Sequence, residues 1–174
     1  MLRDEGVLGP DDGGSSPCGD LDTLALPTSL NALLGARLDS LETGARATLE
    51  RGSVEGEVFH RGAVVALVDP ATRASVHADL EALAAKDFVR PAEASFAGEA
   101  AYRFKHLLVR DAAYQGTAKR LRALLHAQFA DWLEEVVGAR IAEYEEILGY
   151  HLEQSYRYRT ELGPPDGEIR ALGT

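Results

Sequence analysis

The strongest constraint on the fold is an apolar stripe along residues 119–137. Leucine and aromatic side chains recur there every three or four positions, which is the spacing of one helix face. They are Leu121, Leu124, Leu125, Phe129, Trp132, Leu133 and Val136. Gly138 ends this pattern and a second helical stripe covers residues 141–159, so the sequence predicts two antiparallel helices joined by a short turn. One helical pair cannot bury its own apolar faces, and residues 121–158 are therefore expected to meet a further partner.

The preceding part of the chain predicts three helical segments. Residues 27–41 open with cap residues and carry leucines at helical spacing, and residues 43–56 end at a glycine suited to a C-cap. Phe59 and the apolar run 63–68 predict a third, short helix, which Asp69 and Pro70 close.

A strand, a loop and a second strand follow these helices. Residues 76–87 begin as a helix and lead into a strand that ends at Pro91, a residue suited to a sheet edge. Residues 93–105 predict a small flexible loop and then a strand, with Tyr102 and Phe104 on one face. This order is the plan of a winged helix. The predicted fold class is mostly α: a winged-helix domain with a small two-stranded β-wing, followed by an antiparallel helical pair.

The pattern divides the chain into four parts. Residues 1–26 are rich in Gly, Asp, Ser and Pro and predict a poorly structured segment with possible short strands. The winged-helix domain covers residues 27–117, the helical pair covers residues 118–162, and residues 163–174 form a tail.

Charge and composition exclude several classes of function. The chain has 174 residues and a formal charge of −10, which argues against broad binding to nucleic acid or anionic membranes. Cys18 has no second cysteine for an internal disulfide, and no apolar window is long enough to span a membrane. The N-terminus lacks the basic start and apolar core of a signal peptide. A cytoplasmic protein is expected.

No motif predicts catalysis or a metal site. The sequence contains no GxxxxGK[ST], HExxH, CxxC or GxSxG pattern. Paired glutamates at 134–135 and 145–146 lie on helices patterned for packing, where solvated faces are expected. The five histidines show no metal-ligand spacing; they are His60, His77, His106, His126 and His151. We therefore expect no enzyme activity and no resident cofactor or metal in this chain alone.

The helix before the wing would enter the major groove of DNA in a winged-helix DNA-binding protein. Its expected exposed positions are acidic (Asp79, Glu81 and Asp87), against Lys86 as the one basic group. Base and phosphate contacts favour Arg, Lys, Asn or Gln, so DNA is not an expected partner.

His106 is the candidate binding residue, because it lies where the second strand gives way to a helix. Backbone N–H groups are unpaired at a helix N-terminus and the helix dipole is positive there, which suits a phosphate. An imidazole at this position can donate a hydrogen bond to a phosphate oxygen. Arg110 lies one turn further along and could also meet the phosphate. The alternatives are a His106 satisfied by a neighbour and an Arg110 paired with an acidic side chain.

Several blocks of sequence, in order, resemble the region from the winged helix to the first repeat of STAND-type signalling ATPases. The blocks are LPTSLNALLGARLDSL (26–41), LERGSVEGEVFHRGAVVALV (49–68), YRFKHLLVRDAAYQ (102–115), LHAQFADWLEE (125–135) and EEILGYHLEQSYRYRTELGP (145–164). The resemblance is to bacterial proteins that join an adenylate/guanylate cyclase domain, an AAA-like ATPase and tetratricopeptide repeats (TPR).

The resemblance implies that His106 senses the phosphate of bound ADP, with ATP/ADP as the nucleotide of the full-length family protein. It also implies an N-terminal nucleotide-binding domain and a downstream TPR array as partners. The family's P-loop, Walker B residues and cyclase domain are not in this sequence. The predicted function is therefore a non-catalytic regulatory fragment that senses ADP and relays a switch. The alternatives are a free-standing helical protein-interaction module and a winged-helix transcriptional regulator.

Overall fold

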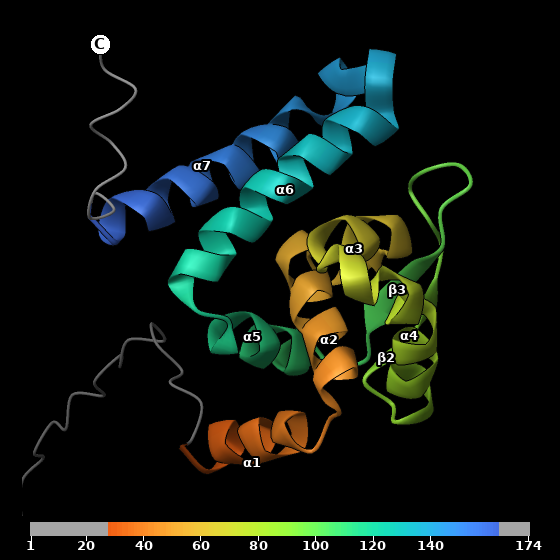
Figure 1. Cartoon of the computed structure of the whole chain (residues 1–174), viewed down its shortest axis with the longest axis vertical. Coiled ribbons are helices and arrows are strands. Elements are labelled where there is room, and N and C mark those ends of the chain that lie inside the picture. The colour runs from red at the N-terminus through yellow and green to blue at the C-terminus, as the bar shows by residue number, and fades with distance from the viewer. Residues whose placement is uncertain (1–27, 164–174) are drawn as a thin grey trace, which may run out of the picture.

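The computed structural model describes residues 28–163 and is mostly helical, as predicted, with one small antiparallel sheet (Figure 1). The predicted N-terminal segment 1–26 and nearly all of the predicted tail lie outside the described residues. None of the described helices is long and apolar enough to cross a bilayer.

The first half of the described chain contains α1 (Thr28–Asp39), α2 (Thr43–Glu55), β1 (Val58–His60), α3 (Arg61–Leu67), the 3-10 helix η1 (Pro70–Ser75) and α4 (Val76–Ala85). The second half contains β2 (Val89–Ala92), β3 (Ala101–Phe104), α5 (Leu107–Gly116), α6 (Lys119–Val137), the 3-10 helix η2 (Gly138–Tyr144) and α7 (Glu145–Glu161).

The sheet has three strands and not the predicted two: β2 and β3 form where strands were expected, and β1 was not predicted. The strand order is β1-β3-β2, and both pairs are antiparallel. Phe59, predicted to be helical, lies in β1 directly opposite Tyr102. Its ring stacks on Tyr102 and also packs against Phe104, which places these three rings on one face of the sheet. A three-residue strand is too short to show alternation, and the helical run after it hid the strand.

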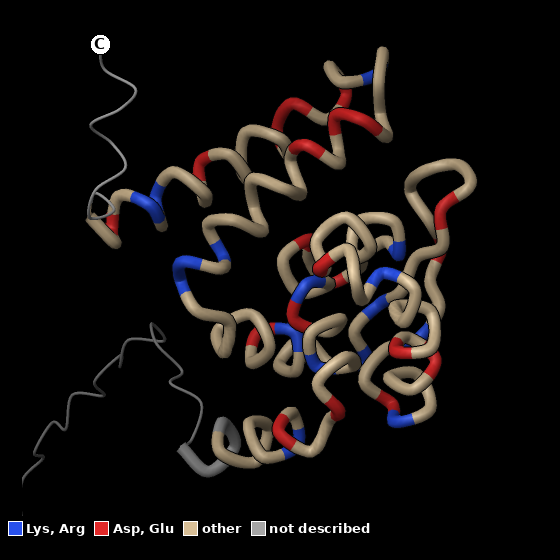
Figure 2. The backbone as a smooth tube through the Cα atoms, viewed as in Figure 1, with Lys and Arg blue, Asp and Glu red and all other residues tan. Residues whose placement is uncertain are grey.

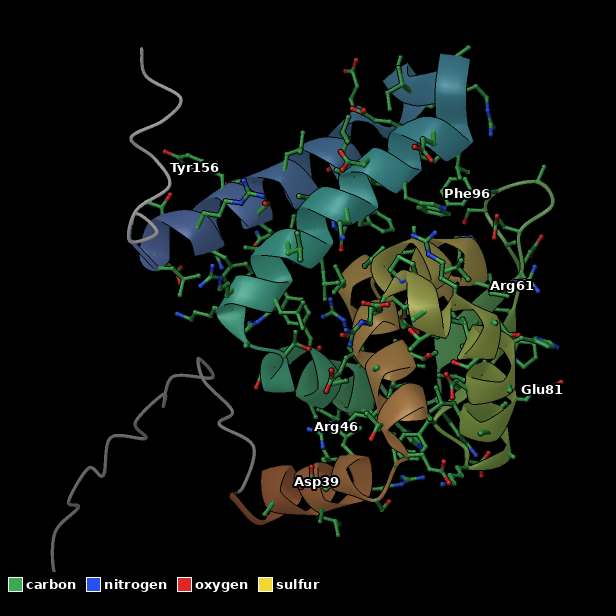
Figure 3. The ribbon with its side chains drawn as sticks, viewed as in Figure 1. Asp39, Arg46, Arg61, Glu81, Phe96 and Tyr156 are labelled. Atoms are coloured by element: carbon green, nitrogen blue, oxygen red, sulfur yellow. The ribbon has the colours of Figure 1, made fainter. Side chains whose placement is uncertain are left out.

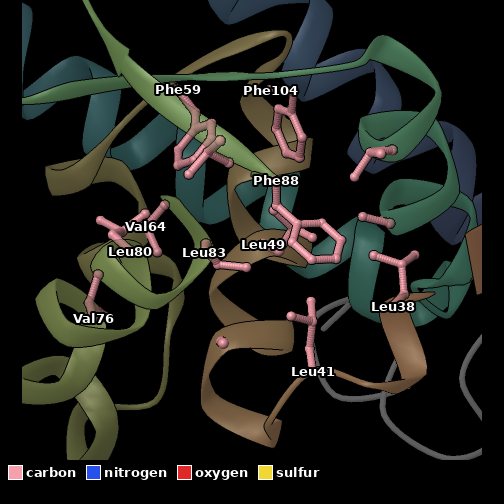
Figure 4. Packing of buried hydrophobic residues seen from close by; sticks show 14 of the residues in the cluster. Leu38, Leu41, Leu49, Phe59, Val64, Val76, Leu80, Leu83, Phe88 and Phe104 are labelled. Carbon is pink, nitrogen blue, oxygen red and sulfur yellow. The ribbon is translucent and has the colours of Figure 1, made fainter. Parts of the chain in front are cut away.

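A first core lies under this face of the sheet and joins it to α1, α2, α4 and α5 (Figure 4). Leu49, Leu80 and Leu83 contribute fully buried side chains from α2 and α4. Packing is tight enough that a Cβ added at Gly52 would lie 2.8 Å from the ring of Phe59. Glycine at this position therefore allows α2 to approach β1 closely.

A second core joins α3 and α6 to the loop between β2 and β3. Phe96, at the centre of that loop, is only 6% exposed and packs edge-on against Trp132, with 5.6 Å between ring centroids (Figure 3). Its ring lies 5.5 Å from that of Tyr144 in η2. The loop was predicted to be flexible, but Phe96 holds its centre against the helical pair.

The two long helices α6 and α7 lie side by side and run in opposite directions (Figure 1). Within their seam, Ser155 Oγ donates a hydrogen bond of 2.8 Å to the Ala123 carbonyl.

One prediction about α4 needs correction. Asp79 is half-buried rather than exposed, since its carboxylate accepts hydrogen bonds from Ser75 and Thr48.

Candidate functional site

The candidate site begins at the junction between β3 and α5. His106 is the N-cap residue of α5 and has an extended backbone (φ −136°, ψ 130°). Its carbonyl accepts the first helical hydrogen bond, from Val109 N at 3.0 Å. Phe104 and Val109 are both buried and fix the chain on either side of the junction, while the His106 side chain is exposed. The imidazole makes no hydrogen bond to any described residue.

The surroundings of this junction are mainly cationic. Lys105 Nζ lies 2.6 Å from the Asp87 carboxylate, and this hydrogen bond lowers the pKa of Asp87. His106 and Arg37 also lie close enough to lower that pKa further. Arg37 donates to the Lys86 carbonyl at 3.3 Å. One exposed carboxylate therefore faces several basic groups, and the region favours an anion.

Arg110 lies on α5 but is held by other partners. Its Nε donates to the Ser53 carbonyl near the end of α2 at 3.0 Å, and its Nη1 donates to Asp111 at 3.0 Å. The guanidinium also lies over the Tyr114 ring, 5.0 Å from its centroid. The structure thus shows the acidic pairing that was the alternative to a phosphate contact, and it does not bring the Arg110 guanidinium to the His106 side chain.

The other end of α5 enters a buried chain of hydrogen bonds. Tyr114 OH lies 2.8 Å from His126 Nε2 on α6 and 3.0 Å from Tyr158 OH on α7. His126 Nδ1 lies 2.9 Å from His151 Nδ1, and Arg122 donates to Tyr158 OH at 3.2 Å. We call these five residues the polar chain. It connects α5, which begins at His106, to both helices of the pair.

The two histidines of the polar chain are neutral at pH 7. Burial lowers the pKa of His126 to about 4, helped by the charges of Arg110 and Arg122. Burial also lowers the pKa of His151 to about 3, helped by His126 and Arg110. The Nδ1–Nδ1 contact is therefore a hydrogen bond from one neutral ring to the other. Burial raises the pKa of Tyr114, which also stays neutral.

The sequence analysis did not identify the polar chain, because it examined the histidines only for metal-ligand spacing. Helical spacing does indicate that both histidines of the polar chain lie on buried helix faces. His126 lies three residues before the buried Phe129, and His151 lies four residues before the buried Ser155. Both therefore belong to buried helix faces. No cluster of three or more acidic, histidine or cysteine side chains suited to a metal occurs among residues 28–163.

Comparison with protein-family models, with curated proteins and with solved structures finds no match to this chain.

Proposed function

We propose that this chain is the non-catalytic winged-helix segment of a STAND-type signalling ATPase, which senses bound ADP through His106 and relays the switch to a C-terminal repeat array. The observation that carries the proposal is the position of His106. Its exposed imidazole stands at the N-terminus of α5, and the far end of the same ten-residue helix is hydrogen-bonded into the helical pair.

The topology supports the winged-helix part of the proposal. The elements follow the order α2, β1, α3, α4, β2, β3, and the central strand of the sheet is the last one. This order agrees with the helix–strand–helix–helix–strand–strand plan expected of a winged helix. The loop between β2 and β3 then corresponds to the wing, and the α6–α7 pair to the first unit of a TPR-like array.

The chemistry at His106 suits one contact to a terminal phosphate. The first N–H groups of a helix have no intrahelical partner, and an imidazole and nearby ammonium groups add donors around them. The described residues provide no glycine-rich loop to hold the rest of a nucleotide. Tight binding of ATP or ADP would therefore depend on a separate nucleotide-binding domain as partner. The chain alone would keep only a weak contact, in the millimolar range, between His106 and a phosphate.

The relay follows from the connection through α5. A shift of the phosphate contact would move the N-terminus of α5, and a short helix moves as a unit. Tyr114 would then move against His126 and Tyr158, and the helical pair would be repositioned. The polar chain gives this proposal a physical link between the two ends of the domain.

Nuclear magnetic resonance of the chain titrated with millimolar ADP tests the proposal. We expect weak shifts of the His106 ring and of the amides of Leu107 and Leu108, and loss of those shifts in the variant His106→Ala. His77 is the matched control, because it is an exposed histidine on α4. Equal shifts at His77, or no shifts at His106, would contradict the proposal.

A second candidate is a protein-interaction module, which the surface of the helical pair favours. Leu124, Leu152 and Tyr156 are large side chains on α6 and α7, and each is about half exposed or more. His106→Ala distinguishes the two functions, because it would leave protein binding through residues 121–158 unchanged. The helix α4 carries Asp79 and Glu81 and no Lys or Arg, so its charge gives no support to the DNA-binding alternative (Figure 2).

A further inference from the structure

An open groove of about 470 Å³ lies between the sheet side of the molecule and the helical pair. Glu55, Val58 and His60 line one wall, and residues of η2 and α7 line the other. Phe96 and Phe129 also contribute to the lining. This volume is within the range of small-molecule sites.

His151 offers the groove an unpaired polar atom. The residue is only 1% exposed, and its Nδ1 is already hydrogen-bonded to His126. No described residue pairs with its Nε2, although His151 lines the groove. Among the buried side-chain nitrogens and oxygens of the described residues, only Arg51 Nε lacks a partner. His151 Nε2 is therefore open to the groove, where the N–H of a ligand could donate a hydrogen bond to it.

The charge of the groove identifies the kind of ligand. Glu55 and Glu146 line it, and no Lys or Arg does. Glu55 binds His60 through the backbone N at 2.8 Å and through Nδ1 at 2.5 Å. His60 Nε2 accepts the Ser95 N–H at 3.1 Å and therefore carries no proton. The His60 ring is neutral, so the negative charge of Glu55 is not cancelled.

The wider surroundings of the groove are also acidic. Acidic residues are frequent along the backbone at the end of the helical pair where α6 and α7 meet η2 (Figure 2). Residues 131–146 carry one basic side chain, Arg140, among six acidic ones: Asp131, Glu134, Glu135, Glu143, Glu145 and Glu146. This end of the molecule attracts cations.

We propose that the groove binds a small organic ammonium ion with an apolar or aromatic body. The ammonium N–H donates to His151 Nε2, and the carboxylate of Glu146 balances its charge. Aromatic rings attract cations through their faces, and Phe96, Tyr144 and Tyr150 line the groove beside the polar groups. The inference does not depend on the proposed function.

The polar chain can supply the acceptor that this ligand needs. His151 Nδ1–H donates to His126 Nδ1, and His126 Nε2–H donates to the Tyr114 oxygen. Tyr114 then donates to Tyr158, which also accepts from Arg122. Every contact has one donor and one acceptor in this arrangement, and His151 Nε2 is left as a bare acceptor.

Fluorescence of the full chain titrated with 2-phenylethylammonium at pH 7.5 tests the inference. Trp132 is the one tryptophan, and its ring lies 5.6 Å from that of Phe96 in the groove wall. We expect a saturable change in fluorescence. The neutral analogue 2-phenylethanol should bind at least about fivefold more weakly than the ammonium ion. The His151 Nε2 resonance should also shift with the ammonium ion.

The variant Glu146→Gln should weaken binding of the ammonium ion by about fivefold. Glu153→Gln is the matched control, since Glu153 is exposed on α7 but does not line the groove, and it should leave binding unchanged. Three results would each overturn the inference: no saturable change up to 10 mM (about the weakest affinity expected of so small a ligand), equal binding of the alcohol, or no effect of Glu146→Gln.

Discussion

The first core, beneath the sheet, is formed almost entirely of hydrocarbon, whereas the seam between α6 and α7 also buries His126, His151, Gln154 and Ser155. An apolar core accepts approximate geometry provided that its volume is filled. A buried hydrogen bond requires its partners in one arrangement, and it costs free energy when a partner is missing. The first core therefore tolerates small changes of geometry, while the polar chain fixes how the helical pair is placed.

Removing a buried leucine from the first core should have the largest effect. The side chain of Leu49 is fully buried, so Leu49→Ala should lower the free energy of unfolding by about 2–5 kcal/mol. Urea unfolding followed by circular dichroism measures this. Leu33→Ala, at a position 65% exposed, is the control and should change stability by less than about 0.5 kcal/mol. Similar losses in both variants would mean that α2 is not the centre of the core.

Acid should weaken the seam before it affects the first core. The folded-state pKa values of His126 and His151, about 4 and 3, lie below their usual value near 6.5. The unfolded chain therefore binds more protons below pH 6.5, and stability falls as the pH drops from about 6.5 to about 4 for His126 and to about 3 for His151. Each histidine contributes a slope of at most about 1.4 kcal/mol per pH unit.

Urea midpoints between pH 7 and pH 4.5 check this slope. His151→Leu should flatten it, and His77→Ala, at an exposed position on α4, should not. A slope that is unchanged in His151→Leu would show that the buried histidines do not control the acid sensitivity of the chain.

Removing one hydroxyl from the polar chain should have an intermediate effect. Tyr114→Phe leaves the ring in place but deprives His126 and Tyr158 of their shared partner. We expect a loss of about 1–3 kcal/mol, with faster amide exchange in α7 than in α2. Tyr156→Phe is the control, because Tyr156 is 72% exposed and points away from the molecule (Figure 3). If amide exchange rose equally in both helices, the polar chain would not be specific to the seam.

The smallest effect is expected at a helical glycine outside both cores. A Cβ added at Gly149 in α7 would meet nothing within 4 Å, so Gly149→Ala should stabilise the chain by about 0.5–1 kcal/mol through helix propensity. Gly52→Ala should instead destabilise it by about 1–3 kcal/mol, because the new methyl group would press on Phe59. Thermal unfolding measures both changes in stability. If both substitutions changed stability in the same direction, α2 would not pack closely on β1.

Long segments with periodic apolar residues were predictable from the sequence. A short strand and a contact between distant segments were not. The leucine and aromatic spacing of residues 119–137 gave α6, and Pro91 correctly marked an edge strand. β1 was missed because three residues cannot show a period of two. Phe96 was assigned to a flexible loop because small residues surround it, and its partner Trp132 lies on a distant helix.

The candidate site shows the same division. The junction at His106 was predictable from the change of pattern between strand and helix. The contact between His126 and His151 joins residues on two helices, and it depends on how far α7 is shifted along α6. Sequence spacing places each histidine on a buried face but does not contain that shift.

The two edges of the small sheet have a consequence for the behaviour of the protein at high concentration. β1 is only three residues long, and β2 carries Pro91, which has no N–H to offer a new strand. Both edges are poor templates for strand addition, the usual route by which sheets aggregate. Association between copies of this chain through the described residues would therefore use exposed apolar side chains of the helices, such as Leu33, Leu107 and Tyr156. Concentrated solutions should not form cross-β fibrils from this sheet.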